Sequence, residues 1–158
     1  MEESIKSGIS FGITSGTITT LGLMMGLYSS TGSKMVVIGG VLTIAIADAL
    51  SDSLAMHVSE ESRKGANKKN IWGATFSTFL AKFIYGLSFL IPLLIFGLRE
   101  AIVVSVIYGL LVLSVLNYKL AKSNSGSVWR TISEHLIIAI IVLIATYYIG
   151  VFVGNVFG

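Results

Sequence analysis

The sequence predicts an all-α membrane protein with five transmembrane helices. Of its 158 residues, 54% are hydrophobic and only 12% are charged, and the mean hydropathy is +0.86. These values lie well outside the range of soluble globular domains. Five apolar stretches are long enough to cross about 30 Å of hydrocarbon, and the loops between them are too short for a soluble domain. We expect one domain, 1–158, with spans at residues 8–29, 36–58, 72–96, 101–120 and 132–157.

The first span is rich in small residues. Gly8, Gly12 and Gly16 repeat every fourth position, and such a face lets another helix approach closely in a membrane. The sequence leaves open whether that helix belongs to the same chain or to a second copy. The hydroxyls of Ser15 and Thr19 either bond to backbone carbonyls one turn earlier or line an ion path.

The second span carries acidic residues where lipid is expected. Asp48, Asp52, Met56 and Glu60 follow one another at every fourth position, so they share one side of a helix over about 18 Å. A central Asp costs roughly 2.5 to 3.5 kcal/mol on insertion, whereas each Leu, Ile or Val returns about 0.3 to 0.6. The carboxylates should therefore face other helices or a wet cavity, and such residues mark ion or proton paths.

The chemistry of this stripe favours a divalent transition metal. Carboxylate oxygens alone suit Mg²⁺, Ca²⁺ or Mn²⁺, while a methionine thioether favours softer ions such as Fe²⁺. Asp52, Met56 and Glu60 together favour such an ion, and we expect no permanently bound cofactor. Buried carboxylates also take up protons and can exchange them for a metal, which is a route to proton antiport. The proposed metal ligands are Asp48, Asp52, Met56 and Glu60.

The third span contains a basic residue at the same depth. Lys82 lies about 15 Å along the helix from Trp72, close to the depth predicted for Asp48. It is a possible charge partner of Asp48 or Asp52, and such a pair either only holds helices together or is displaced by a cation that arrives at the carboxylate. With two acids and one base, we expect at least one carboxylate to stay free. Pro92 should kink this span near its outer end.

The last two spans differ in their polar content. The fourth has few polar residues and is expected to be scaffold, while the fifth begins with an acidic residue and a histidine and ends with tyrosines and glycines typical of an interface. Four residues are expected near the cytoplasmic surface, where they form either an acidic mouth that concentrates cations or solvated helix ends. These residues are His57, Glu61, Glu134 and His135.

The basic residues predict the orientation of the chain. Lys34 and Arg99 fall on one side of a five-span arrangement, and eight others fall on the opposite side. The positive-inside rule then places the amino terminus in the cytoplasm and the carboxyl terminus outside. The net charge of +3 reflects this topology and not nucleic-acid binding. The eight are Lys6, Arg63, Lys64, Lys68, Lys69, Lys119, Lys122 and Arg130.

Several other classes of function have no support in the sequence. The amino terminus is acidic where a signal peptide would be basic, so the first span should be retained. There are no cysteines, which excludes disulfides and thiolate metal sites. No HExxH pair, no nucleophile with a base and no glycine-rich phosphate loop is present. We therefore expect no enzymatic activity.

Four segments resemble the vacuolar iron transporter family. Residues 11–22 resemble the family's first-span signature, and residues 53–60 resemble the end of its second span. Residues 90–94 match the Ile-Pro-Leu motif of the third span, and residues 147–150 match the closing helix. The resemblance implies a homodimeric five-span Fe²⁺/Mn²⁺ carrier that exports metal from the cytosol in exchange for protons. It further implies an ion path between or beside the first two spans, with Met56 and Glu60 as pore methionine and cytoplasmic glutamate.

Two features depart from the family pattern. Ser15 stands where the family has a first-span Asp, and the loop after the second span is too short for the cytoplasmic metal-binding helices of larger members. In an antiparallel hairpin Asp52 should lie at the depth of Ser15, so Asp52 is expected to replace the missing acid. We expect a multi-pass protein of a prokaryotic cell membrane. The alternatives are a non-transporting scaffold with Asp–Lys pairing and a metal-gated cation channel.

Overall fold

The chain folds into long α-helices joined by short turns. The computed structural model describes residues 2–123 and 127–158. Within these residues, five segments are long and apolar enough to cross a membrane, as predicted. One of these segments, Lys68–Ile95, consists of two consecutive helices. The helices are α1 (Glu2–Thr31), α2 (Lys34–Glu61), α3 (Lys68–Ser88), α4 (Leu90–Ile95), α5 (Leu98–Ser123) and α6 (Val128–Phe157).

The turns that join the first three helices use residues suited to tight reversals. Gly32 and Gly65 have φ of +58° and +77°, values at which a side chain is strained. Ser33 then caps α2, because its hydroxyl accepts from the N–H of Val36. Asn67 caps α3 in the same way. Each turn therefore ends in a residue whose side chain satisfies the first free N–H groups of the next helix.

The third span is broken near its outer end, as the position of Pro92 predicts. Between α3 and α4, Phe89 donates its N–H to the carbonyl of Gly86. Pro92 has no N–H to offer to the carbonyl of Ser88, one turn earlier, so the regular helix cannot continue through this point. The break lets α4 turn towards α5.

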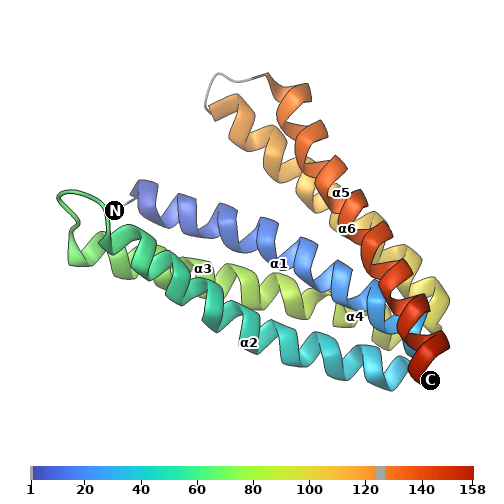
Figure 1. The fold of residues 1–158 in the computed structure, drawn as a ribbon. Helices are drawn as coiled ribbons and strands as arrows, with labels where there is room; N and C mark the ends of the chain where they lie inside the picture. The colour runs from blue at the N-terminus through green and yellow to red at the C-terminus, as the bar shows by residue number, and fades with distance from the viewer. Residues whose placement is uncertain (1, 124–126) are drawn as a thin grey trace.

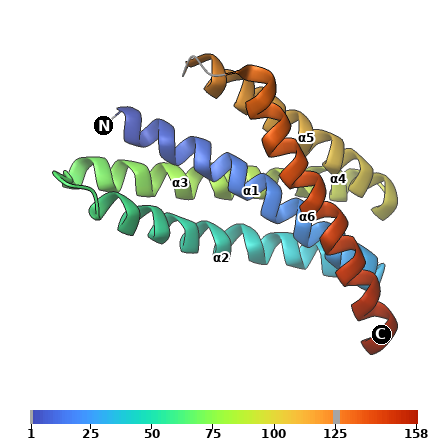
Figure 2. The same cartoon turned by 45° about the horizontal axis from the view of Figure 1, so that its top comes forward.

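The central helix of the bundle is α1. In Figures 1 and 2 it lies between the α2–α3 pair and the α5–α6 pair. The α5–α6 pair diverges from α1, α2 and α3 towards the end that carries the amino terminus, and the two groups come together near the carboxyl terminus (Figure 1). The amino terminus and the α2–α3 turn share one end of the molecule, while the carboxyl terminus lies at the other.

The glycines of α1 allow its close contacts with two neighbours. A Cβ on Gly12 would lie 2.7 Å from the carbonyl oxygen of Thr78 on α3. A Cβ on Gly22 would lie 2.9 Å from Val142 on α6. The partner of the repeat at Gly8, Gly12 and Gly16 is therefore α3 of the same chain, which the sequence left open.

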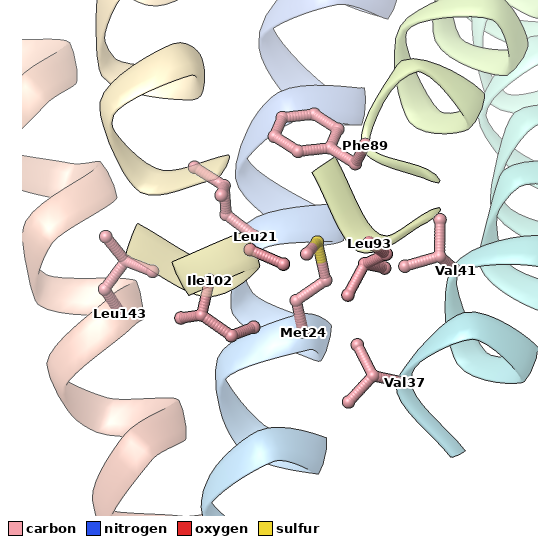
Figure 3. Packing of buried hydrophobic residues seen from close by; sticks show 9 residues of the cluster. Leu21, Met24, Val37, Val41, Phe89, Leu93, Ile102 and Leu143 are labelled. Carbon is pink, nitrogen blue, oxygen red and sulfur yellow. The ribbon is translucent and has the colours of Figure 1, made fainter. Parts of the chain in front are cut away.

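A hydrophobic cluster fills the bundle towards the α1–α2 turn, where side chains from α1, α2, α4, α5 and α6 meet (Figure 3). Met24 on α1 is only 1% exposed and is surrounded by side chains from the other helices. The methionine is therefore core material and not a ligand. Its neighbours in the cluster include Leu21, Val37, Val41, Phe89, Leu93, Ile102 and Leu143.

The outer surface of the bundle is apolar. One face of α2 exposes a leucine, isoleucine or valine at every fourth position, each about half exposed. A soluble protein does not expose such a continuous stripe, whereas lipid tails cover it without cost. The chain is an integral, multi-pass membrane protein. The stripe consists of Leu42, Ile46, Leu50, Leu54 and Val58.

Candidate functional site

A buried ammonium group holds α2 and α3 together in the middle of the bundle. Lys82 extends from α3, and its side chain is 3% exposed. Its Nζ lies 2.6 Å from Oδ2 of Asp48 and also donates to Oδ2 of Asp52. The basic residue that the sequence placed at this depth thus contacts both acidic residues.

Hydroxyl groups of α1 complete the surroundings of the ammonium. Lys82 Nζ donates to Ser15 Oγ over 2.9 Å, so all three N–H groups of the ammonium have an oxygen acceptor. Ser15 Oγ donates to Asp52 Oδ2 over 2.7 Å, and Thr19 Oγ1 donates to Asp48 Oδ2 over 2.7 Å. We call the oxygens of Ser15, Thr19, Asp48 and Asp52 the oxygen cage.

The antiparallel hairpin of α1 and α2 builds this cage. The two aspartates are one turn apart on α2, and Ser15 and Thr19 are one turn apart on α1. Because the helices run in opposite directions, Ser15 meets Asp52 and Thr19 meets Asp48. The equal depth that we expected of Ser15 and Asp52 is therefore present. Thr19 Oγ1 also lies 2.9 Å from the Ser15 carbonyl, which is the acceptor one turn earlier that the sequence suggested, so its single O–H is shared between this carbonyl and Asp48.

The carboxylates and the ammonium differ in their exposure. The side chains of Asp48 and Asp52 are 25% and 22% exposed, against 3% for Lys82. The ammonium is sealed among α1, α2 and α3, while the carboxylates reach the outer surface of the hairpin. The expectation that one carboxylate stays free is wrong, because residues one turn apart on α2 converge on the same ammonium. With all three side chains in their ionised forms, the group has a formal charge of −1.

A groove between α1 and α2 leads to the cage. It has a volume of about 650 Å³, and Asp48 is the charged residue in its lining. Its α2 side is made largely of small residues, whose regular spacing along the sequence is a signal that the sequence reasoning did not use. The lining is Leu23, Leu27, Val36, Gly40, Thr43, Ile44, Ala47, Asp48 and Ser51.

Glu60 lies apart from the cage, in a pocket at the end of the bundle that carries the amino terminus. It is 5% exposed, and its Oε1 is 2.9 Å from Nη1 of Arg63. The pocket has a volume of about 380 Å³ and includes Glu3 and Ser7 of α1. Two helical turns, about 12 Å, separate Glu60 from Asp52, and the half-buried Met56 stands between them. The predicted stripe on α2 therefore consists of two separate acidic sites, the aspartate pair beside Lys82 and Glu60 beside Arg63.

The two histidines of the predicted cytoplasmic mouth have separate surroundings. His57 points to α3, where its Nδ1 is 3.0 Å from Thr75 Oγ1 and its ring meets Trp72 edge-on. His135 on α6 lines a different pocket, of about 650 Å³, together with Glu3 and Lys6 of α1. Thr75 is a contact that sequence spacing alone did not reveal.

The acidic residues of that predicted mouth are at the surface. Glu134 Oε1 is 2.9 Å from Nε of Arg130, and Glu61 is exposed at the end of α2. Nearby on α1, a hydrogen bond from Lys6 lowers the pKa of Glu2. Of the four mouth residues, Glu134 and His135 are neighbours on α6, whereas His57 faces α3 and Glu61 is exposed at the end of α2.

The cage can hold a cation, although its acidic residues number only two. Within residues 2–123 and 127–158, no three His, Asp or Glu side chains lie together as metal ligands. A metal ion at the cage would draw on the carboxylates, on the hydroxyls of Ser15 and Thr19, and on water. Oxygen ligands of this kind suit divalent ions such as Mn²⁺.

A multi-span helical protein with acidic residues inside its spanning region has the features of an ion transporter. The VIT family model matches residues 52–151, which is more than half of the chain. The chain belongs to this family, the vacuolar iron transporters, and membership indicates metal-ion transport. No curated protein matches the chain at a significant level. The match includes Asp52 and Lys82 and leaves out α1 and Asp48.

Proposed function

We propose that this protein exports a divalent transition-metal ion, Fe²⁺ or Mn²⁺, from the cytosol in exchange for protons. One observation carries the proposal: two carboxylates, each about a quarter exposed, lie inside a spanning helix of a VIT family member, and one of them, Asp48, lines a groove between α1 and α2. Carboxylates inside the spanning region cost free energy, and those that occur there usually mark the path of an ion or a proton. The family supports metal as the cargo, and the oxygen cage supports a divalent ion.

The polar groups along the α1–α2 seam support a path for the ion. The pocket at Glu60 borders Glu3 and Ser7 of α1. The oxygen cage follows about 12 Å further along α2, and the groove beyond it continues past Leu23 and Leu27. An ion that follows this seam meets a carboxylate near the cytoplasm, then Met56, then a pair of carboxylates.

The proposal includes a homodimer, in which the α1–α2 grooves of two copies face each other. The groove lining contains Gly40, Ala47 and Ser51 on α2, and small residues of this kind let helices approach closely in a membrane. The ion path would then lie between the copies, with the cage of each copy open towards it.

Cysteine cross-linking tests this dimer. Because the natural chain has no cysteine, Ala47→Cys introduces one thiol per copy in the groove. We expect mild oxidation in membranes to produce a disulfide-linked dimer of this variant. Val103→Cys on α5, also exposed, is the matched control and should remain monomeric on a denaturing gel. Cross-linking at position 103 and not at 47 would contradict the proposed interface.

Metal flux in proteoliposomes tests the function itself. We expect the purified protein to move Mn²⁺ and Fe²⁺ across the membrane, to move Mg²⁺ poorly, and to move metal faster when a proton gradient drives exchange. Flux that does not respond to a proton gradient would indicate a metal-gated channel instead. A protein that moves no metal under any gradient would reject the proposal.

A second candidate is a non-transporting membrane scaffold. It is favoured by one observation: Lys82 uses all three of its N–H groups within the cage, as a purely structural ion pair would. The same flux measurement separates the two, because a scaffold gives no metal-dependent flux.

A further inference from the structure

We propose that Lys82 is a tethered cation that competes with the transported metal ion for the oxygen cage. The proposal rests on the proposed function, since it concerns how the same site is regulated. Its starting point is the coordination of Nζ, which has Asp48, Asp52 and Ser15 as its three acceptors. The cage is therefore already filled by a cation that belongs to the protein.

The charges make occupation by Lys82 and by a metal ion mutually exclusive. With the ammonium in place, the cage has a net charge of −1, and a divalent ion would bring the total to +1 beside the ammonium. Without the ammonium, the two carboxylates carry −2, which a divalent ion neutralises. In a medium of low dielectric constant the second arrangement avoids the repulsion between the ammonium and the metal ion that the first one contains.

The exposures indicate how the exchange occurs. The side chain of Lys82 is sealed at 3% exposure, whereas both carboxylates are more than a fifth exposed, and Asp48 borders the groove. A metal ion therefore reaches the carboxylates from the groove, on the side away from α3. The four-carbon stem of lysine lets the ammonium withdraw while α3 stays in place.

The stem of Lys82 lies directly against the backbone of α1. A Cβ on Gly16 would be 3.1 Å from Lys82 Cγ, so the glycine provides the space that the stem occupies. The repeat at Gly8, Gly12 and Gly16 predicted only that Gly16 lies at a contact between helices. In this structure it also positions the competing ammonium.

The competition has a consequence for selectivity. A monovalent ion that displaces the ammonium replaces one positive charge by another and gains no charge neutralisation. A divalent ion that displaces the ammonium neutralises one more negative charge of the cage. In the absence of metal, the ammonium keeps two carboxylates from standing unpaired in the membrane. Lys82 thus both favours divalent cargo and stabilises the metal-free protein.

Equilibrium binding of Mn²⁺ to the purified full-length protein in detergent tests the proposal. We expect Lys82→Met, which keeps the length of the stem and removes the charge, to bind Mn²⁺ at least about tenfold more tightly than the natural protein. Lys82→Arg keeps the charge and should bind as the natural protein does. Lys34→Met makes the same change at a lysine that bonds to the Phe96 carbonyl, and should leave Mn²⁺ affinity unaltered.

The outcomes separate this proposal from the proposed function. A folded Lys82→Met protein whose Mn²⁺ affinity equals or falls below that of the natural protein would overturn the competition. If neither protein binds Mn²⁺, the proposed function fails instead. A spectroscopic titration of bound Mn²⁺ also distinguishes Lys82 from a merely structural residue, whose loss would weaken binding.

Chemical labelling of the natural protein covers the case in which Lys82→Met does not fold. Acetylation of lysines, mapped by mass spectrometry, should leave Lys82 unmodified without metal and modify it when Mn²⁺ is saturating. Lys68, which is exposed, serves as the internal reference and should react equally in both conditions. Continued protection of Lys82 with Mn²⁺ bound would overturn the proposal.

Discussion

Asp52→Asn is expected to lower Mn²⁺ transport in proteoliposomes by about 100-fold. The substitution removes one of the two carboxylates that attract a divalent ion, so the cage without the ammonium carries a formal charge of −1 in place of −2. A unit charge about 4 Å away is worth about 4 kcal/mol at an effective dielectric constant of 20. This energy corresponds to a factor of roughly 1,000 in rate, and because Asp52 is partly exposed to solvent, which screens its charge, we expect about 100-fold. The initial rate of metal uptake measures the effect.

The Asp52→Asn protein should remain folded, which makes the loss of transport specific. Lys82 keeps Asp48 as its partner at 2.6 Å, so no buried charge is left unpaired. Glu100→Gln removes an exposed carboxylate at the start of α5 and serves as the control, with transport unchanged. Full Mn²⁺ transport by Asp52→Asn would mean that this carboxylate is not on the ion path.

Ser15→Asp is expected to make the stability of the protein depend on metal. The resemblance of residues 11–22 to the first span of the family implies an aspartate at this position, and here it would add a third carboxylate to the cage, with one ammonium to neutralise three acids. We expect the melting temperature in metal-free buffer to fall by about 5 °C, from a destabilisation of about 2 kcal/mol. Mn²⁺ should restore it, since an ion that binds only the folded state stabilises it.

Ser15→Ala is the matched control for this variant. It removes the hydrogen bonds of Ser15 with Asp52 and Lys82 but adds no charge. We expect a smaller fall in melting temperature. The difference in melting temperature between Ser15→Ala and the natural protein should remain when Mn²⁺ is added to both. A Ser15→Asp protein that melts at the same temperature with and without Mn²⁺ would show that the cage does not take up the metal.

The fold was predictable because long apolar stretches separated by short polar turns leave a membrane chain few alternatives. The helices extend beyond the predicted spans at most ends, since polar residues such as Glu2 and Glu61 continue the helix outside the hydrocarbon. The depth of Lys82 was also readable, because a rise of about 1.5 Å per residue fixes the height of a residue along its helix.

Which neighbouring helix covers each face of a helix was not predictable in the same way. Spacing at every fourth position assigns residues to one face of a helix but does not say which neighbour covers that face. Asp48 and Asp52 therefore appeared in one stripe with Glu60, although the structure places the two aspartates on Lys82 and Glu60 beside Arg63. The contact of His57 with Thr75 depends on how α2 and α3 are rotated, which the sequence does not encode locally.

The location of bound Mn²⁺, from its anomalous X-ray scattering in crystals of the full chain, tests the central claim most directly. We expect a peak between the carboxylates of Asp48 and Asp52, with the ammonium of Lys82 moved out of contact with them. A peak confined to the pocket at Glu60, with Lys82 still bonded to both aspartates, would contradict it.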